Sequence, residues 1–510
     1  MNEANSRIVR NTGLLYFRLI FLTLINLYAV RVTLEALGDI DYGVFNVVAS
    51  VVASLSILTG ALTSATQRFL SFHLGKRDFE SYSHTFSLLL MSFAVIAGGL
   101  VVVGEGIGYF FIEKWLEIPA DRISAAYWVF QTSLATFAVG LITIPYTSSI
   151  VANERMGAFA SFSIAEGGCR LATALILAVY GGDRLILYGV LTALTSIVVL
   201  LMSMQYCHLK FRFCKYVWKW DRSIFTKLSS YIGLNLFGSI SAMLSSQGQN
   251  ILLNIFFGPI INASKAIADR IQSVIISFSS NLYMAVNPQM VKSYAVNDLD
   301  RCRSLMLKTS KMSFMLVFIL AFPLICNMGA ILELWLGAQS KAPFMTSFSK
   351  LVLIYCLVMT LEPPITSLIQ ASGNIKRYQI CVGAVTLSYI PIAALTLWLG
   401  ATPIMTLIVL IAIMAIAQCM RVRIVHDQIG LSYSDYCKTV ILPIMKVIIV
   451  ALPLYWVVSE WTLPGLWIGA LCKVAVAGIF GITVAFLLGL NSSDRHTIMN
   501  LVGSRLTRRP

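Results

Sequence analysis

The chain has 510 residues, of which 58% are hydrophobic and only 12% are charged, and its formal net charge is +15. Its mean hydropathy is +0.80. Soluble domains carry about 25% charged residues, so this composition leaves too little polar surface for a soluble globule. The composition therefore excludes a soluble protein and indicates an all-α polytopic membrane protein.

Hydropathy predicts about fourteen transmembrane helices of roughly 18–26 residues each. The first apolar run follows Arg7 and Arg10, as in a signal peptide. It is too long for one, contains arginine and lacks a cleavage motif, so we interpret it as a retained span. The predicted spans are 11–34, 44–66, 84–108, 123–148, 158–180, 185–206, 229–256, 264–286, 308–330, 346–370, 379–399, 403–420, 441–459 and 465–489.

The basic residues are distributed unequally between the two sides of these spans. About 26 lysines and arginines fall on the side shared by both termini and about 4 on the other side, which predicts cytoplasmic termini. The positive charge therefore follows the positive-inside rule and does not indicate nucleic-acid binding.

The first two spans form an apolar hairpin, residues 11–78, with polar residues at membrane depth. Arg18, Asn26 and Arg31 lie in its first half. An arginine inside a bilayer costs at least about 2.5 kcal/mol, so it marks a buried partner or a functional site. Arg31 has Glu35 one helical turn away, whereas the residues three and four positions from Arg18 are apolar. Arg18 therefore needs an acid from another helix, water in a cavity or an anionic ligand.

Short sequence matches recur at an interval of about 220 residues, which predicts a duplicated chain. They occur at equivalent places in the predicted topology, so chance similarity does not explain them. The matches are P-Y-T-S-S-I-V-A from Pro145 with P-I-T-S-L-I-Q-A from Pro364, Leu37-Gly38 with Phe257-Gly258, and Ser71-Phe72 with Ser293-Tyr294.

We expect two six-helix lobes related by a pseudo-two-fold axis along the membrane normal, with two added C-terminal helices. The linker between the lobes interleaves basic and aromatic residues, which is typical of a segment lying on anionic headgroups. A specific site for one lipid headgroup is the alternative. The predicted parts are the N-terminal lobe 1–206, the linker 207–228, the C-terminal lobe 229–420, helices 13 and 14 over 421–489, and a basic tail 490–510.

The spans of the second repeat also carry polar residues. Gln247, Asn250 and Asn254 share one helix face, which indicates either hydrogen-bonded packing or a hydrophilic lumen. Arg270 has no acid three or four positions away, and its neighbour Asp269 already has Lys265 at that spacing. We therefore expect Arg270 to line a cavity or to bind a ligand.

Acidic residues within the spans are the candidates for coupling transport to an ion. Glu362 lies deep in the tenth span without a local cation. It either pairs with a lumen arginine, which we favour, or takes up and releases a proton. We name Glu362 and Asp269 as candidate coupling residues, and expect Glu166 and Arg170 to form a structural pair.

No motif for an extramembrane active site is present. The sequence lacks the phosphate-binding loop and the G-x-S-x-G and H-E-x-x-H motifs. Its ten cysteines include no C-x-x-C and its five histidines form no cluster, so we expect no disulfide framework, metal site or cofactor. No loop exceeds about twenty residues, so we expect a protein that is not an enzyme.

The hairpin and two later loops resemble a known family. The segments are N-T-x-L-L-Y-x-R from Asn11, L-G-D-I-D-Y-G-V-F-N from Leu37, A-L-T-S-A-T-Q-R-F-L-S-F-x-L-G-K from Ala61, I-P-Y-T-S-S-I-V-A-N-E-R-M-G-A-F from Ile144, and N-P-Q-M-V-K-S-Y-A from Asn287. Together they resemble the Wzx-type flippases of the multidrug/oligosaccharidyl-lipid/polysaccharide exporter superfamily.

The resemblance implies two six-helix bundles around a central cavity. It implies a flippase that moves an undecaprenyl-pyrophosphate-linked oligosaccharide from the cytoplasmic to the periplasmic leaflet of the bacterial inner membrane, for O-antigen or capsule synthesis. Arg18 and Arg270, and less directly Arg31, then become candidate ligands of the diphosphate. Membrane lipids surround such a protein, and polysaccharide polymerases or ligases are candidate partners.

Two other functions remain open at this point. A cation-coupled exporter of drugs or metabolites would share the fold, but it needs unpaired acids in its cavity, and Glu362 is the main one available. An integral-membrane glycosyltransferase or glycan polymerase needs a sizeable extramembrane loop, and the longest outer loops, near Glu113–Arg122 and Glu333–Met345, are short.

Overall fold

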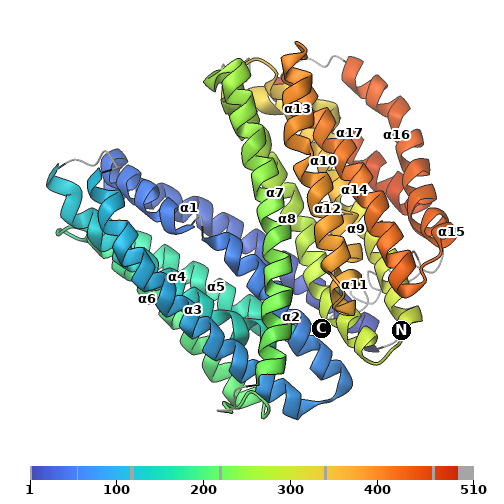
Figure 1. The fold of residues 1–510 in the computed structure, drawn as a ribbon. Coiled ribbons are helices and arrows are strands. Elements are labelled where there is room, and N and C mark those ends of the chain that lie inside the picture. Colours follow the sequence, from blue (N-terminus) through green and yellow to red (C-terminus); the bar gives the residue numbers. More distant parts are fainter. Residues whose placement is uncertain are drawn as a thin grey trace, which may run out of the picture. The chain divides into compact units, whose positions relative to one another are not determined.

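The computed structural model describes residues 3–53, 55–114, 120–217, 221–337, 342–461, 466–491 and 495. All regular structure in these ranges is helical (Figure 1). The helices of the first half are α1 Glu3–Ala53, α2 Ser56–Lys76, α3 Phe79–Lys114, η1 Ala120–Arg122, α4 Ile123–Ala152, α5 Met156–Val179, α6 Arg184–Lys210, α7 Arg222–Phe257 and α8 Pro259–Ala295. Those of the second half are α9 Leu299–Leu336, α10 Met345–Met359, α11 Glu362–Ser372, α12 Lys376–Leu387, α13 Tyr389–Trp398, α14 Met405–Ile429, α15 Tyr433–Tyr436, η3 Cys437–Ile441, α16 Leu442–Glu460, α17 Leu466–Val484 and η4 Ala485–Gly489.

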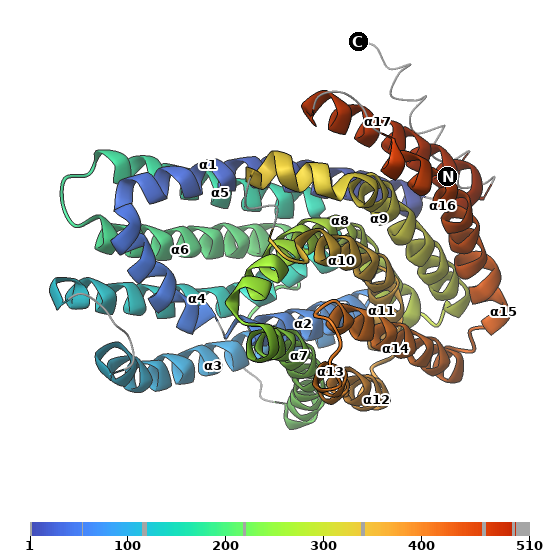
Figure 2. The same ribbon diagram turned by 90° about the horizontal axis from the view of Figure 1, so that it is seen from above.

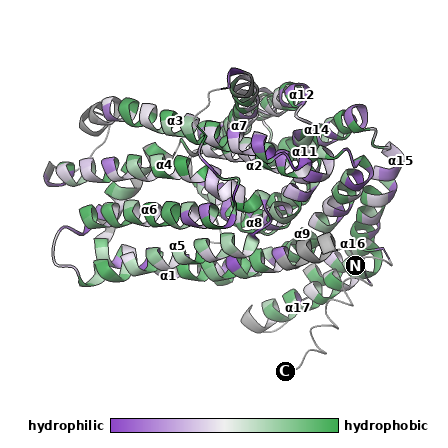
Figure 3. Cartoon of the chain, turned by 90° about the horizontal axis from the view of Figure 1, so that it is seen from below, coloured by the Kyte–Doolittle hydropathy of each residue, from purple (hydrophilic) through white to green (hydrophobic). Residues whose placement is uncertain are grey.

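A helix or a pair of consecutive helices occupies each of the fourteen predicted spans. Eleven segments in the described ranges are long and apolar enough to cross a membrane. The predicted spans 44–66, 229–256 and 264–286 also contain helices, but they are not among those eleven. Hydrophobic residues predominate along the helices of the ribbon in Figure 3, and the expected all-α polytopic membrane protein is confirmed.

Two helices that hydropathy predicts as single spans are interrupted. The tenth predicted span consists of α10 and α11, and the eleventh consists of α12 and α13. Pro363 and Pro364 stand at the start of α11, where proline fits the first turn of a helix because the backbone N–H there has no helical partner. The interruption before α11 places Glu362 at a helix N-terminus.

The predicted acidic turn between the first two spans is a kink within one long helix. Helix α1 continues through Gly38, which has non-helical torsion angles of φ 76° and ψ 170°. A left-handed φ costs little for glycine because it has no Cβ. The first membrane helix therefore joins the second through a single residue.

The described residues form two compact units, which we describe separately. The first contains Met1–Ser239 and Val291–Asn297, and the second contains Ile240–Met290 and Asp298–Pro510. In the first unit α5 packs between α1 and α6, and α4 packs against α6, α3 and α2 (Figure 2). In the second unit α9 packs against α10, α11 and α17, while α14 packs against α10, α11, α12 and α13. Each unit has its own buried core, so each side chain below is placed within its own unit.

Candidate functional site

Arg18 lies on α1 against α5 and is half-buried. Its guanidinium carbon is 4.7 Å from the centre of the Phe159 ring, within the range of a cation–π contact. The carboxylate of Glu166, also on α5, interacts electrostatically with Arg18. Helix α5 therefore supplies the acid that the sequence around Arg18 lacks.

The hydrogen bonding of Arg18 is incomplete. Its Nε is buried and has no hydrogen-bond partner among the described residues. Glu166 is bound to Arg170 at 2.6 Å, which confirms the predicted pair, and it makes no ion pair within bonding distance of Arg18. A half-buried guanidinium with an unused N–H remains available to an anion.

The two other candidates on α1 are exposed. Arg31 forms the expected ion pair with Glu35, with Nε 2.9 Å from Oε1, and its side chain is 78% exposed. Asn26 is also exposed. Because Arg31 already has a counter-ion, Arg18 is the stronger candidate of the two arginines for anion binding.

Arg270 and Asp269 lie on α8, in the second unit. Arg270 is exposed, and the described residues supply no ion-pair partner for it. Asp269 Oδ1 binds Nζ of the buried Lys265, as the spacing predicts. Within the described part of the chain, Arg270 is therefore an unpaired cation, whereas the charge of Asp269 is neutralised.

The polar stripe predicted on α7 does not face the interior of its unit. Gln247 and Asn254 are exposed and Asn250 is half-buried. A second polar row, formed by Ser241, Ser245 and Gln249, is buried instead. Ser245 Oγ donates to the Thr386 carbonyl at 2.9 Å, and Gln249 Nε2 donates to Thr406 Oγ1 at 3.3 Å. Within the second unit, helix packing uses this row and not the predicted one.

Glu362 is paired with an arginine, which is the alternative that the sequence favours. Its Oε1 lies 2.9 Å from Nη2 of Arg421 on α14. Arg421 is 3% exposed and also contacts Gln418 Oε1 at 3.4 Å and the Tyr378 hydroxyl. Gln418 in turn donates to the Leu361 carbonyl at 3.0 Å. The pair thus belongs to a buried network joining α11, α12 and α14, and the prediction that Glu362 couples transport to an ion stays a prediction.

Sequence reasoning missed Arg421 as a partner. The twelfth predicted span ends at residue 420, whereas α14 continues to Ile429 and buries Arg421, Val422 and Val425. Apolar residues continue at helical spacing beyond residue 420, and this pattern could have predicted the longer helix. Glu362 and Arg421 are 59 positions apart in the sequence, so local spacing could not predict that they pair.

Residues at the end of α8 pack in the first unit with the loop after α4. Lys292 Nζ binds Glu154 Oε1 at 2.6 Å, and the Glu154 carbonyl accepts a hydrogen bond from Asn11 Nδ2 at 3.3 Å. Gly75 of α2 makes room for this contact, because a Cβ at that position would lie 2.7 Å from the Lys292 carbonyl oxygen. These residues connect α1, α2, α8 and the α4–α5 turn at the end that the charge distribution assigns to the cytoplasm.

Part of the basic linker is held against α3. Ser83 Oγ donates to the Phe213 carbonyl at 2.7 Å, and Ser87 Oγ donates to the Lys215 carbonyl at 3.1 Å and accepts from Val217 N at 2.8 Å. Arg212 and Lys215 remain exposed, while Cys214 is buried. These two basic side chains of the segment therefore face outwards, and its position on anionic headgroups stays a prediction.

Neither the family models nor the curated proteins include a match to this sequence. Several solved structures are similar to this one, and they include structures of MATE transporters. A MATE transporter in the straight conformation has a TM-score of 0.72 at 14% identity, over 84% of this chain and 96% of that chain. An outward-facing multidrug resistance MATE family transporter of the MOP superfamily has a TM-score of 0.71 at 14% identity, over 86% of this chain and 98% of that one. This chain has the MATE transporter fold.

The description of a third matching structure concerns the polarity of its binding pocket. A MOP superfamily transporter from Pyrococcus furiosus, described as having a binding pocket of reverse polarity that suggests a different function, has a TM-score of 0.72 at 14% identity, over 84% of this chain and 96% of that chain. At this identity the likeness establishes the fold, and the substrate must be argued from the side chains of this chain.

Proposed function

We propose that this protein is a secondary exporter with the MATE fold, and that its substrate is an anionic lipid-linked oligosaccharide. The proposal places it in the bacterial inner membrane with both termini in the cytoplasm. It would move the substrate from the cytoplasmic to the periplasmic leaflet by alternating access, while the prenyl tail stays in the lipid. Polysaccharide polymerases or ligases would then use the flipped substrate.

The charge state of the membrane helices is the observation that supports an anionic substrate. The two candidate coupling acids are paired, Asp269 with Lys265 and Glu362 with Arg421, and Glu166 is paired with Arg170. Arg18, in contrast, keeps a buried Nε that has no hydrogen-bond partner in the described ranges. A diphosphate provides several acceptor oxygens and can bind a guanidinium through two hydrogen bonds.

A multidrug exporter is the second candidate, and the comparisons favour it over the flippase. A structure with this fold is that of a multidrug resistance transporter. A cationic drug would need a carboxylate in its path, and Glu362 or Asp269 would have to exchange its present partner for the drug. The two candidates therefore differ in the sign of the substrate charge.

Two cell-based measurements separate these functions. If the flippase proposal is right, removing the protein from its host causes one lipid-linked glycan to accumulate in the cytoplasmic leaflet, and expressing the protein again clears it. If the exporter acts on cationic drugs, overexpression speeds the efflux of a cationic dye and no glycan accumulates on removal. Dye efflux without glycan accumulation would reject the flippase proposal.

A further inference from the structure

Helices α1 and α5 of the first unit pack side by side and run in the same direction. A methyl group on Gly157 would lie 3.8 Å from Leu14 Cδ1, and one on Gly167 would lie 2.6 Å from Leu22 Cδ2. The contacts therefore advance by eight positions on α1 and by ten on α5. Arg18 lies midway between the two leucines, so it stands opposite the stretch of α5 between the two glycines.

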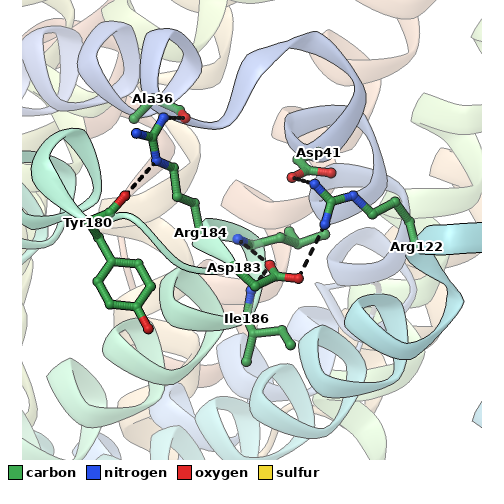
Figure 4. Close-up of polar contacts among 8 residues, drawn as sticks. Ala36, Asp41, Arg122, Tyr180, Asp183, Arg184 and Ile186 are labelled. Carbon is green, nitrogen blue, oxygen red and sulfur yellow. Dashed lines mark hydrogen bonds and ion pairs between the residues drawn. The ribbon is translucent and has the colours of Figure 1, made fainter.

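The same two helices are joined again at the end that the charge distribution assigns to the outside (Figure 4). Arg184, at the start of α6, donates from Nη1 to the Ala36 carbonyl of α1 at 2.8 Å. Its Nε donates to the Tyr180 carbonyl, directly after α5, at 3.0 Å. Because the glycine contacts and this arginine fix the register of α1 against α5, we expect Arg18 to change partners by moving its side chain and not by sliding of the helices.

Helix α5 offers Arg18 two different partners on one face. Phe159 and Glu166 are seven residues apart, which is about two helical turns, so they share that face. Arg18 stands about one turn from each, a distance that its long side chain can span. Its guanidinium carbon now lies 4.7 Å from the centre of the Phe159 ring, while Glu166 binds Arg170 at 2.6 Å and acts on Arg18 only at longer range.

The two partners leave Arg18 with different capacities to bind an anion. The Phe159 ring attracts the cation but provides no oxygen acceptor, and the buried Nε of Arg18 has no hydrogen-bond partner among the described residues. A carboxylate, in contrast, neutralises a guanidinium and accepts up to two of its N–H groups. Arg18 can therefore bind an anionic ligand while it lies on Phe159, and loses much of that capacity when it pairs with Glu166.

We propose that Glu166 is a positioning residue that competes with the anionic group of the substrate for Arg18, and that Arg170 holds Glu166 away while the substrate is bound. Release follows when Arg18 moves from Phe159 to Glu166, because the anion then loses its cation. The return of Glu166 to Arg170 makes Arg18 available for the next substrate. The exchange involves ion pairs and hydrogen bonds only.

This inference rests on the proposed function, since it assumes an anion at Arg18, and it adds the group that regulates release from that site. Binding of farnesyl diphosphate to the full-length protein in detergent, measured by isothermal titration calorimetry, tests it. We expect Glu166→Gln to bind this probe about threefold more tightly, the effect of removing a partly exposed charge pair. Arg170→Ala should bind it about threefold more weakly, because Glu166 is then available to Arg18.

Two controls separate competition for Arg18 from a general effect of charge. Glu105→Gln makes the same change in net charge on α3, where Glu105 accepts a hydrogen bond from Gln131 at 2.7 Å, and should leave binding of the probe unchanged. In the background Arg18→Ala, adding Glu166→Gln should not strengthen the weakened binding. A threefold gain in either control would show that Glu166 acts through the overall charge and would overturn the proposal.

Transport kinetics in proteoliposomes distinguish release from a structural role of Glu166. Glu166→Gln should lower both the half-saturating substrate concentration and the maximal rate, because the substrate binds more tightly and leaves more slowly. A lower rate without tighter binding would mean that Glu166 only stabilises the fold.

The binding results also separate this inference from the proposed function. If Arg18→Ala binds the probe as tightly as the wild type, the proposed anion site itself is rejected. If Arg18→Ala binds more weakly but Glu166→Gln and Arg170→Ala bind like the wild type, the competition alone is rejected. Arg170→Ala decides the matter even if Glu166→Gln does not fold.

Discussion

Gly38 and Gly258 are separated by 220 positions and both have a positive φ, of 76° and 79°. Two further pairs at nearly the same interval share a positive φ. Arg77 with 56° corresponds to Asn297 with 60°, and Glu154 with 59° corresponds to Gly373 with 77°. Helices therefore kink or end at matching places in the two halves of the sequence. This agreement supports the repeat predicted from short sequence matches.

We expect Gly38→Ala and Gly258→Ala each to destabilise the protein, by about 1–3 kcal/mol. A residue with a Cβ rarely adopts a positive φ, so alanine raises the energy of the backbone conformation at both positions. Both glycines have open space around them, so no packing difference should separate the two variants. Thermal unfolding in detergent, followed by intrinsic fluorescence, gives the comparison.

Gly60→Ala is the matched control for these variants. Gly60 lies within α2, has open space where the methyl group of alanine would lie and has no positive φ, so alanine there should leave stability unchanged or raise it by about 0.5–1 kcal/mol. A loss at Gly60 equal to the loss at Gly38 would mean that the positive φ is not the cause.

Gly75→Ala should be more harmful than its helical position suggests. The new methyl group would lie 2.7 Å from the Lys292 carbonyl oxygen and 2.8 Å from the Ala295 Cβ, so the end of α8 must move. Overpacking of this kind costs about 1–3 kcal/mol. We expect faster trypsin cleavage after Lys292 in Gly75→Ala than in the wild type or in Gly60→Ala. Equal cleavage rates would show that α8 does not depend on this close approach.

The Glu362–Arg421 network predicts non-additive energetics. Arg421→Met leaves a carboxylate without its cation, and removing one partner of a buried pair costs about 3–5 kcal/mol. The double variant Glu362→Gln, Arg421→Met removes both charges and should regain at least about 1 kcal/mol of this loss. Chemical unfolding of both single variants and the double variant provides the measurement, and purely additive losses would contradict the coupling.

The predicted ion pairs that the structure confirms are all local in sequence. Arg31 with Glu35, Glu166 with Arg170 and Lys265 with Asp269 follow from i,i+4 spacing alone, since such residues face each other on any helix. The partner of Glu362 comes from another helix, and no periodicity specifies which helices meet. The sequence therefore predicted that Glu362 pairs with an arginine without identifying Arg421.

The orientation of α7 could not be predicted for a related reason. Its polar residues lie on more than one face, so the row with Gln247 and the row with Gln249 fit helical spacing equally well. Hydrogen bonds to Thr386 and Thr406 bury the second row. Which face packs is decided by the neighbouring helices, and their identity is not encoded in α7 itself.

Transport of a lipid-linked diphosphate oligosaccharide in proteoliposomes is the most direct test of the proposed function. The proteins to compare are the wild type, Arg18→Ala, Arg18→Lys and Arg170→Ala, each reconstituted to the same level. We expect Arg18→Ala to reduce transport at least about tenfold, the effect of losing roughly 1.4 kcal/mol of anion binding. Arg18→Lys should retain part of the activity, since it keeps the charge but loses bidentate bonding. Arg170→Ala frees the Glu166 carboxylate, which also acts on Arg18, so we expect transport by this variant to lie between that of the wild type and that of Arg18→Ala. Transport by Arg18→Ala at the wild-type rate would contradict the account.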